Sequence, residues 1–400
     1  MMLLLALLTA VAWIGGVMYT PAFPAVAQDL GVSDAEIQLT LTTFMAGLAT
    51  AQLIYGPASD RFGRRPVLLF SLALFGLGSV AVALSPDVGF MAIARLFQAA
   101  GAAGGIVLTR AIVRDIHDFE GSVRGMAVLN IGSSMAPGIA LLVGGALSVW
   151  LGWRSLFWMT AALVLILFVV TSLSLRETRA TPTGPSQGSA SSLFDLLGFL
   201  RSPLFMSYSL SQAFFTSTIF AFMAGAPFFL VAAFGVSTDG VGLLTALMPT
   251  GFIIGNVLSN RLSRRISMTR QLWIGGSVAA GTVALFAVMH GSGLLSVYAV
   301  GVLAPLFTLG IGFNTPNATA GAIEVNPARA GTGSSLYGFI SFGAAAPASF
   351  LVGVVDDGSG TGMFLLMMGF GIAGLLATLA AIALSPGRAP EPTEAGAAGP

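Results

Sequence analysis

The chain has 400 residues, of which 56% are apolar and 8% are charged, with a formal net charge of +1 at pH 7. A soluble protein carries roughly 25% charged residues, so lipid must cover most of the surface of a chain this poor in charge. The absence of cysteine excludes disulfides, thiol catalysis and thiolate metal sites. Two histidines are too few for a multi-histidine metal site, and we expect neither a metal nor a cofactor.

Apolar segments of about 20 residues, the length that spans a bilayer, recur along the whole chain and predict an all-α integral membrane protein. The first contains Pro21 and Pro24 and lacks a basic n-region, so we interpret it as a span rather than a cleaved signal peptide, although Ala25-Val26-Ala27 resembles a signal-peptidase site. The twelve predicted transmembrane helices are residues 3–23, 37–58, 66–85, 89–111, 125–147, 155–174, 206–233, 241–259, 271–290, 294–317, 331–354 and 362–384.

A basic hairpin separates the second and third spans, where residues 56–65 read Gly-Pro-Ala-Ser-Asp-Arg-Phe-Gly-Arg-Arg. Gly56 is predicted to let two helices approach closely, and Gly63 to permit a tight turn. Asp60 is placed to pair with a neighbouring arginine or a helix terminus. The arginines that hold this loop in the cytoplasm are Arg61, Arg64 and Arg65.

The hairpin recurs 200 positions later in weakened form. This repeat predicts a protein built from two copies of one six-helix unit. The residues that match Ser59, Arg61, Arg64 and Arg65 at this offset are Ser259, Arg261, Arg264 and Arg265.

The fourth span contains a charge within its apolar sequence. Arg95 is surrounded by apolar residues, and Gln98, three positions on, shares its helix face. An arginine inside a membrane helix is by default a functional-site hypothesis. The alternative is a structural arginine near the outer interface that snorkels or bonds to carbonyl groups. Asp115 lies at the inner end of the same span.

The fifth span combines a proline with a glycine pair. Pro137 removes one helical hydrogen bond and kinks the helix, while Gly144 and Gly145 allow close packing. The alternative interpretation is an ordinary kinked membrane helix.

Several polar residues inside spans are candidates for a substrate cavity, although each has the alternative of packing or of a helix–helix hydrogen bond. Phe215 and Phe222 stand seven residues apart and share a face of the seventh span, where they are candidates for an apolar drug pocket. The polar candidates are Tyr19, Asn130, Gln212, Asn256, Asn314, Asn317 and Tyr337.

The longest polar interruption, residues 176–202, has the composition of a flexible linker. We therefore predict a six-helix bundle over 1–175, a cytoplasmic linker over 176–202, a second bundle over 203–385 and a disordered cytoplasmic tail over 386–400. Within the linker, residues 193–200 are predicted to form a short amphipathic helix on the membrane surface.

The arginines predict the orientation. All 17 basic residues are arginines, and with the N-terminus inside, only Arg154 falls in an external loop and only Arg95 in the middle of a span. This positive-inside bias predicts a multi-pass protein of a bacterial cytoplasmic (inner) membrane with both termini in the cytoplasm.

The hairpin resembles the signature loop of the major facilitator superfamily (MFS), and its surroundings resemble the Bcr/CflA branch of drug:proton antiporters. The resemblance implies two pseudo-symmetric six-helix bundles around a central cavity and transport by alternating access. It also implies that Arg95 and Gln98 take part in proton transfer and substrate coupling, and that Pro137, Gly144 and Gly145 help to seal the cavity. The stretches that carry it outside the hairpin include Met18-Tyr19-Thr20-Pro21, Arg95-Leu96-Phe97-Gln98-Ala99 and Arg110-Ala111-Ile112-Val113-Arg114-Asp115.

The chain departs from the branch in its acidic residues. Val17 stands where the branch usually has an acidic residue, and no Asp or Glu lies in the middle of a predicted span. Glu36 and Asp115, both near helix ends, are the nearest carboxylates. Because arginine cannot be deprotonated in proteins, proton coupling follows from the resemblance and not from these residues.

We therefore expect a secondary transporter that exports small amphipathic molecules in exchange for protons. The alternatives are an uncoupled facilitator or importer, and a receptor or scaffold, which the intact hairpin argues against. No nucleophile elbow, phosphate loop or basic patch supports an enzyme or a nucleic-acid-binding protein. The expected partners are membrane lipid and a small-molecule substrate, neutral or anionic rather than cationic, and the expected state is a monomer.

Overall fold

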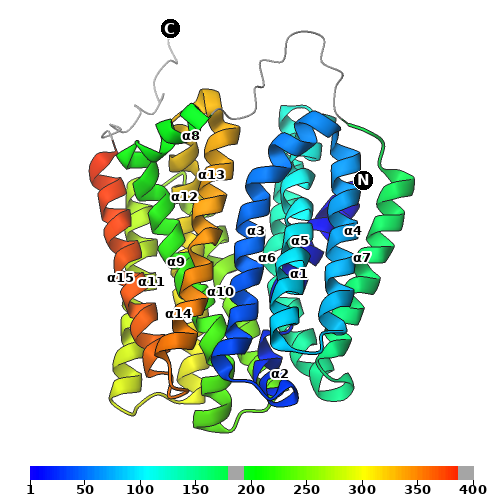
Figure 1. The fold of residues 1–400 in the computed structure, drawn as a ribbon. Coiled ribbons are helices and arrows are strands. Elements are labelled where there is room, and N and C mark those ends of the chain that lie inside the picture. The colour runs from blue at the N-terminus through cyan, green and yellow to red at the C-terminus, as the bar shows by residue number, and fades with distance from the viewer. Residues whose placement is uncertain (179–192, 386–400) are drawn as a thin grey trace.

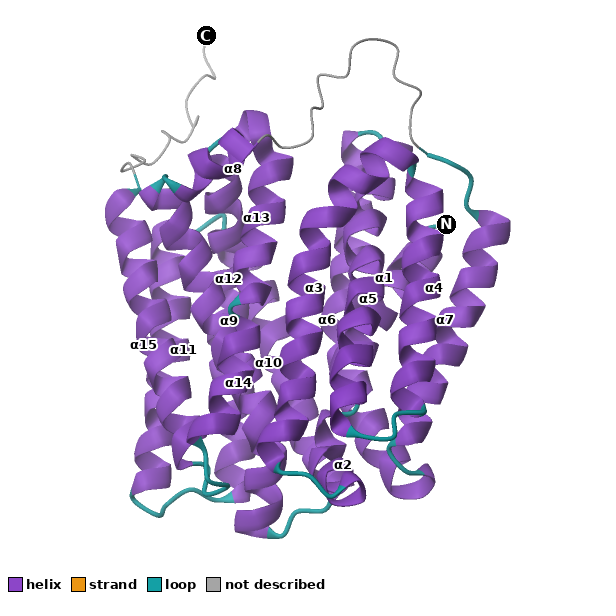
Figure 2. Ribbon diagram, viewed as in Figure 1, coloured by secondary structure: helices purple, strands orange, loops and turns teal. Residues whose placement is uncertain are grey.

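The computed structural model describes residues 1–178 and 193–385, and within these residues it is helical with no strand (Figure 2). Twelve of the described helices or helix pairs are long and apolar enough to cross a membrane, which confirms the twelve predicted spans. The first and tenth spans continue further than expected, to Leu30 and Glu324. The tenth includes Pro316, which removes one helical hydrogen bond without ending the helix.

The helices fall into two sets of six spans. The first set comprises α1 (Met2–Val17) with η1 (Thr20–Ala22) and α2 (Phe23–Leu30), α3 (Asp34–Phe62), α4 (Arg64–Ala83), α5 (Val88–Ile116), α6 (Phe119–Leu151) and α7 (Arg154–Ser174). The second set follows α8 (Leu193–Leu200) and comprises α9 (Pro203–Phe234), α10 (Thr238–Leu262), α11 (Met268–Gly291), α12 (Val297–Glu324), η2 (Pro327–Arg329), α13 (Ala330–Gly343) with α14 (Ala345–Val355), and α15 (Thr361–Leu384).

The two sets pack in the same pattern and stand side by side (Figure 1). In the first set α3 and α4 pack on α5, α4 packs on α7, and α1 packs on α6. In the second set the matching pairs are α10 and α11 on α12, α11 on α15, and α9 on α14. This correspondence confirms two pseudo-symmetric six-helix bundles, which we call the first and second halves.

Proline interrupts the first and eleventh spans. Pro21 and Pro24 stand at the starts of η1 and α2, where a missing N–H and a fixed φ are tolerated. The eleventh span divides at Ala344, because Pro347 has no N–H to donate to Gly343. Ser217 on α9 donates a hydrogen bond of 3.0 Å to the carbonyl of Ala344, so a neighbouring helix supplies a hydrogen-bond donor at the break.

The halves meet along a seam formed mainly by two pairs of spans, the fifth with the eighth (α6 with α10) and the second with the eleventh (α3 with α13 and α14). The ribbons lie closer together at the end that carries α2 than at the opposite end, which carries α8 (Figure 1). We call these the α2 end and the α8 end. The rings of Trp13 and Phe342 meet across this seam with centroids 5.4 Å apart, and Thr42 and Ser349 share a hydrogen bond of 2.9 Å.

Two predictions about the polar segments have different outcomes. Residues 193–200 form the predicted short helix, although its position on a membrane surface stays a prediction. The predicted disordered tail and the middle of the linker lie outside the described residues. The boundaries at 175 and 203 likewise stay a prediction.

Candidate functional site

The hairpin between α3 and α4 is a tight turn at the α8 end. Gly63 has a φ of +99°, a conformation that residues with a side chain rarely adopt. A Cβ at this position would also lie 2.6 Å from Oε2 of Glu177. These two constraints confirm the predicted role of Gly63.

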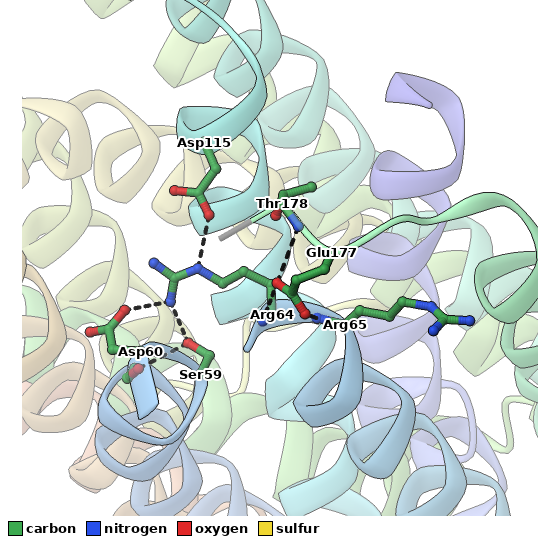
Figure 3. Close-up of polar contacts among 8 residues, drawn as sticks. Ser59, Asp60, Arg64, Arg65, Asp115, Glu177 and Thr178 are labelled. Atoms are coloured by element: carbon green, nitrogen blue, oxygen red, sulfur yellow. Dashed lines mark hydrogen bonds and ion pairs between the residues drawn. The ribbon is translucent and has the colours of Figure 1, made fainter. Parts of the chain in front are cut away.

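Arg64 connects three helices (Figure 3). Its Nε donates to Asp115 Oδ2 on α5 at 2.9 Å, and its Nη1 donates to Asp60 Oδ1 on α3 at 2.6 Å. Nη1 also donates to the hydroxyl of Ser59 at 2.5 Å. The pairing predicted for Asp60 is therefore confirmed, and Asp115, expected only at a helix end, joins the same network.

Glu177 completes the hairpin, although it is not among the site residues predicted from the sequence. Its carboxylate accepts the backbone N–H groups of Arg64 at 2.8 Å and Arg65 at 3.2 Å, so it satisfies the first N–H groups of α4 (Figure 3). Arg65 also donates from Nη2 to the carbonyl of Ser172 on α7 at 2.8 Å. The only available signal was that α4 begins after a glycine and has no acidic residue in its first turn.

The role predicted for Gly56 is wrong in this structure. A Cβ at Gly56 would meet no heavy atom within 4 Å, so no helix approaches closely there. Arg61, the remaining candidate in the hairpin, is exposed, with its guanidinium 5.2 Å from the ring of Phe62.

Arg95 is fully buried inside the first half. Its Nη1 donates to the carbonyl of Gly15 at 2.7 Å, and its Nη2 donates to the carbonyl of Gly16 at 3.0 Å. Both carbonyls belong to the last turn of α1, where helical carbonyls lack partners and a cation is favourable. The guanidinium therefore bonds to carbonyl groups, as expected for a structural arginine, which was the alternative to a functional one.

The surroundings of Arg95 bring three predicted site residues together. Gln98 Oε1 accepts from Arg95 at 2.6 Å, and Gln98 Nε2 donates to Ser79 on α4 at 2.8 Å. The guanidinium carbon lies 4.4 Å from the ring centroid of Tyr19 and 4.1 Å from that of Phe44, which are cation–π distances. This cluster connects α1, α3, α4 and α5.

The two predicted pocket phenylalanines are packed in the core of the second half. Phe215 and Phe222 are at most 1% exposed. Phe215 lies against Gly374 on α15, and Phe222 lies against the rings of Phe286 and Phe307. Neither lines an open pocket in this structure, which corrects the prediction.

The remaining polar candidates of the second half are mostly buried, and they form hydrogen bonds within one helix or between neighbouring helices. Gln212 donates to Thr216 at 3.3 Å, while Tyr337 accepts from Thr319 at 3.1 Å. Asn314 donates to Ser211 at 3.3 Å, and Asn317 donates to Ser259 at 2.9 Å. Asn256 donates to the Phe252 carbonyl at 3.4 Å. Asn130 on α6, in the first half, is exposed.

The glycine pair of α6 serves two interfaces at once. A Cβ on Gly144 would lie 1.8 Å from the carbonyl oxygen of Met18, within the first half. A Cβ on Gly145 would lie 3.0 Å from Cα of Gly242 on α10, across the seam. Pro137 precedes Gly138, whose Cβ would lie 3.5 Å from Pro249. The predicted close packing is therefore present, and part of it joins the halves.

The acidic residues of the described spans lie near helix ends. Glu36 accepts the backbone N–H of Ser33 in a capping box at the start of α3, and Asp115 is bonded to Arg64. Among the described residues no group of three His, Cys, Asp or Glu side chains could hold a metal ion.

Twelve spans in two matching halves, with a charged hairpin at one end, define a multi-pass membrane transport protein. The sequence profile of the Major Facilitator Superfamily matches residues 5–349, and the chain belongs to this superfamily. It is therefore a transporter and not an enzyme.

Its relatives include drug-resistance proteins. A chloramphenicol resistance protein of Pseudomonas aeruginosa is 33% identical over 342 residues, covering 84% of this chain and 79% of the relative. Multidrug resistance protein D of Escherichia coli is 29% identical over 375 residues, covering 92% and 93%. An uncharacterized MFS-type transporter of Bacillus subtilis is 30% identical over 342 residues, covering 84% of both chains. These names agree with the resemblance to the drug-resistance branch.

Solved structures support the fold. A bacterial homolog of the human lysosomal transporter Spinster, in an inward-facing conformation, has a TM-score of 0.76 at 17% identity and covers 96% of this chain and 95% of its own. At this identity the likeness establishes the fold alone.

Proposed function

We propose that this chain exports small amphipathic molecules across a bacterial inner membrane in exchange for protons. It works as a monomer with both termini in the cytoplasm. Relatives named for resistance to chloramphenicol and to multiple drugs support export as the direction. The arginines of both hairpins lie at the α8 end. By the positive-inside rule, this supports a cytoplasmic position for that end.

The observation that carries the proposal is the distribution of contacts between α3 and the eleventh span. A Cβ on Gly353 would lie 3.1 Å from Cα of Ala35, at the α2 end. Thr42 and Ser349 bond further along, and a Cβ on Gly338 would lie 2.7 Å from Oε1 of Gln52. The ribbons of the two halves lie farther apart at the α8 end than at the α2 end (Figure 1), which supports a state closed on the outside and loaded from the cytoplasm.

The hairpin supports rigid movement of the first half. Arg64, Asp60 and Asp115 join α3, α4 and α5, and Glu177 holds the start of α4. Alternating access needs halves that rotate without internal rearrangement, and a network that ties helices together at one end supplies this stiffness.

The geometry of Arg95 favours neutral substrates. Its guanidinium is turned toward carbonyl groups of α1 and is enclosed by aromatic rings. Neutral groups of the first half therefore stabilise this charge, which lies inside that half. Since no carboxylate of the described residues lies in the middle of a span, we expect neutral amphipathic molecules to be transported better than permanently cationic ones.

Transport and proton movement can be measured together in proteoliposomes that contain a pH-sensitive dye. We expect a neutral drug to move protons in the opposite direction with the wild-type protein. Without a mid-span carboxylate, a carboxylate near a helix end must carry the proton, and we propose Asp115 for this role. The proton signal should therefore fall at least about tenfold in Asp115→Asn. Asp357→Asn, which changes an exposed carboxylate at the α2 end, is the matched control.

The same measurement decides between the antiporter and an uncoupled facilitator or importer, which the lack of a mid-span carboxylate favours. Substrate that equilibrates without any proton movement would contradict coupling. Faster transport of a permanently cationic dye than of neutral drugs would contradict the proposed substrate preference.

A further inference from the structure

The repeated hairpin keeps its arginines in the second half but not their partners. Asp60 of the first hairpin corresponds to Asn260. Ser259, which corresponds to the Ser59 that accepts from Arg64, instead donates to Gln271 at 2.7 Å. In the part of the chain that the structure describes, no hydrogen bond or ion pair involves the side chains of four exposed arginines: Arg261, Arg264, Arg265 and Arg270.

An apolar groove begins beside these arginines. Helices α10 and α11 follow one another in the chain but both pack on α12, which forms the floor of the groove through Leu309 and Phe313. Leu262 and Ile266, from the turn that carries the arginines, line its end, and Val278 lines its wall. The groove has a volume of about 190 Å³ and a lining without polar surface.

We propose that this groove and the four arginines form a binding site for an anionic phospholipid. One acyl chain lies in the groove, and the phosphate lies at Arg264 and Arg265. Guanidinium groups bind phosphate through paired hydrogen bonds, and basic clusters at the cytoplasmic ends of spans attract anionic lipids. A transported drug with polar groups would find no polar partner in the groove, whereas an acyl chain needs none.

The position of the site predicts a consequence for transport. Helix α10, one wall of the groove, also forms the seam with α6 through Gly242. A bound acyl chain therefore braces a helix that contacts the other half. The matching arginine of the first half, Arg64, is occupied by Asp60 and Asp115, so the site belongs to the second half alone.

The site can be tested by native mass spectrometry of the full-length protein, titrated with phosphatidylglycerol or with phosphatidylcholine of the same acyl chains. We expect wild type to retain phosphatidylglycerol in preference, and the double variant Arg264→Gln, Arg265→Gln to lose this preference by about tenfold. Val278→Phe, which fills the groove, should weaken binding of both lipids. Arg201→Gln, an exposed arginine near the start of α9, should leave binding unchanged.

An unchanged preference in the double variant, measured on protein with wild-type unfolding temperature, would overturn the proposal. So would an equal loss in Arg201→Gln, since attraction would then be a property of the whole basic surface. Displacement of phosphatidylglycerol by excess inorganic phosphate, together with undiminished binding in Val278→Phe, would also overturn it, because the groove would have no part in binding.

Discussion

Arg95→Ala is expected to lower the free energy of unfolding by about 3–5 kcal/mol, because several buried acceptors lose a charged donor at once. The carbonyls of Gly15 and Gly16 and Oε1 of Gln98 all accept from this guanidinium. The deletion also leaves a cavity between the rings of Tyr19 and Phe44. Denaturation of the purified protein in detergent measures the loss.

Arg95→Lys separates charge from geometry. A lysine ammonium keeps the charge but lacks the planar fork that reaches two carbonyls while lying between two rings. We expect an intermediate loss of stability, whereas exposed Arg201→Gln should have no effect. An Arg95→Ala protein with wild-type stability and no transport would contradict the structural role and would return Arg95 to the substrate site.

Gly144→Ala is expected to have the second large effect. The added Cβ would lie 1.8 Å from the backbone oxygen of Met18, and a backbone atom at the end of a helix cannot move aside as a side chain can. Overpacking of a closed interface costs about 1–3 kcal/mol and sometimes more, so we expect the upper part of this range and transport below about one tenth of wild type.

Gly281→Ala is the matched control for Gly144→Ala. A Cβ at Gly281, in the middle of α11, would meet no heavy atom within 4 Å. The higher helix propensity of alanine should leave stability unchanged or raise it by up to about 1 kcal/mol. Unfolding temperature and transport, measured side by side, should separate the two variants, and equal behaviour would contradict the packing described for α6.

The spans could be predicted because their signals are local. Apolar length set their number, and Pro21 and Pro24 marked the break after α1. The turn at Gly63 could likewise be predicted from residues 56–65 alone. The same reasoning was wrong at Gly56, because the distance between two helices depends on every helix packed around them.

Partners and faces could not be predicted for the same reason. Glu177 accepts a hydrogen bond from the backbone N–H of Arg64, which lies 113 residues earlier in the chain. No local sequence pattern links the two residues. Phe215 and Phe222 lie on a helix that is largely buried and has no single apolar face, so shared periodicity did not reveal whether their face lined a cavity or the core. The sequence showed that Arg95 is a charged residue inside an apolar span, but its acceptors on α1 could be identified only in the folded bundle.

The proposed alternating access requires the seam at the α2 end to open during transport. The chain has no cysteine, so the pair Thr42→Cys, Ser349→Cys, placed where the two hydroxyls are 2.9 Å apart, can be cross-linked without background. In proteoliposomes we expect oxidation to stop substrate transport, reductant to restore it, and each single variant to be insensitive to both. Transport at the wild-type rate while the cross-link is intact would contradict this requirement.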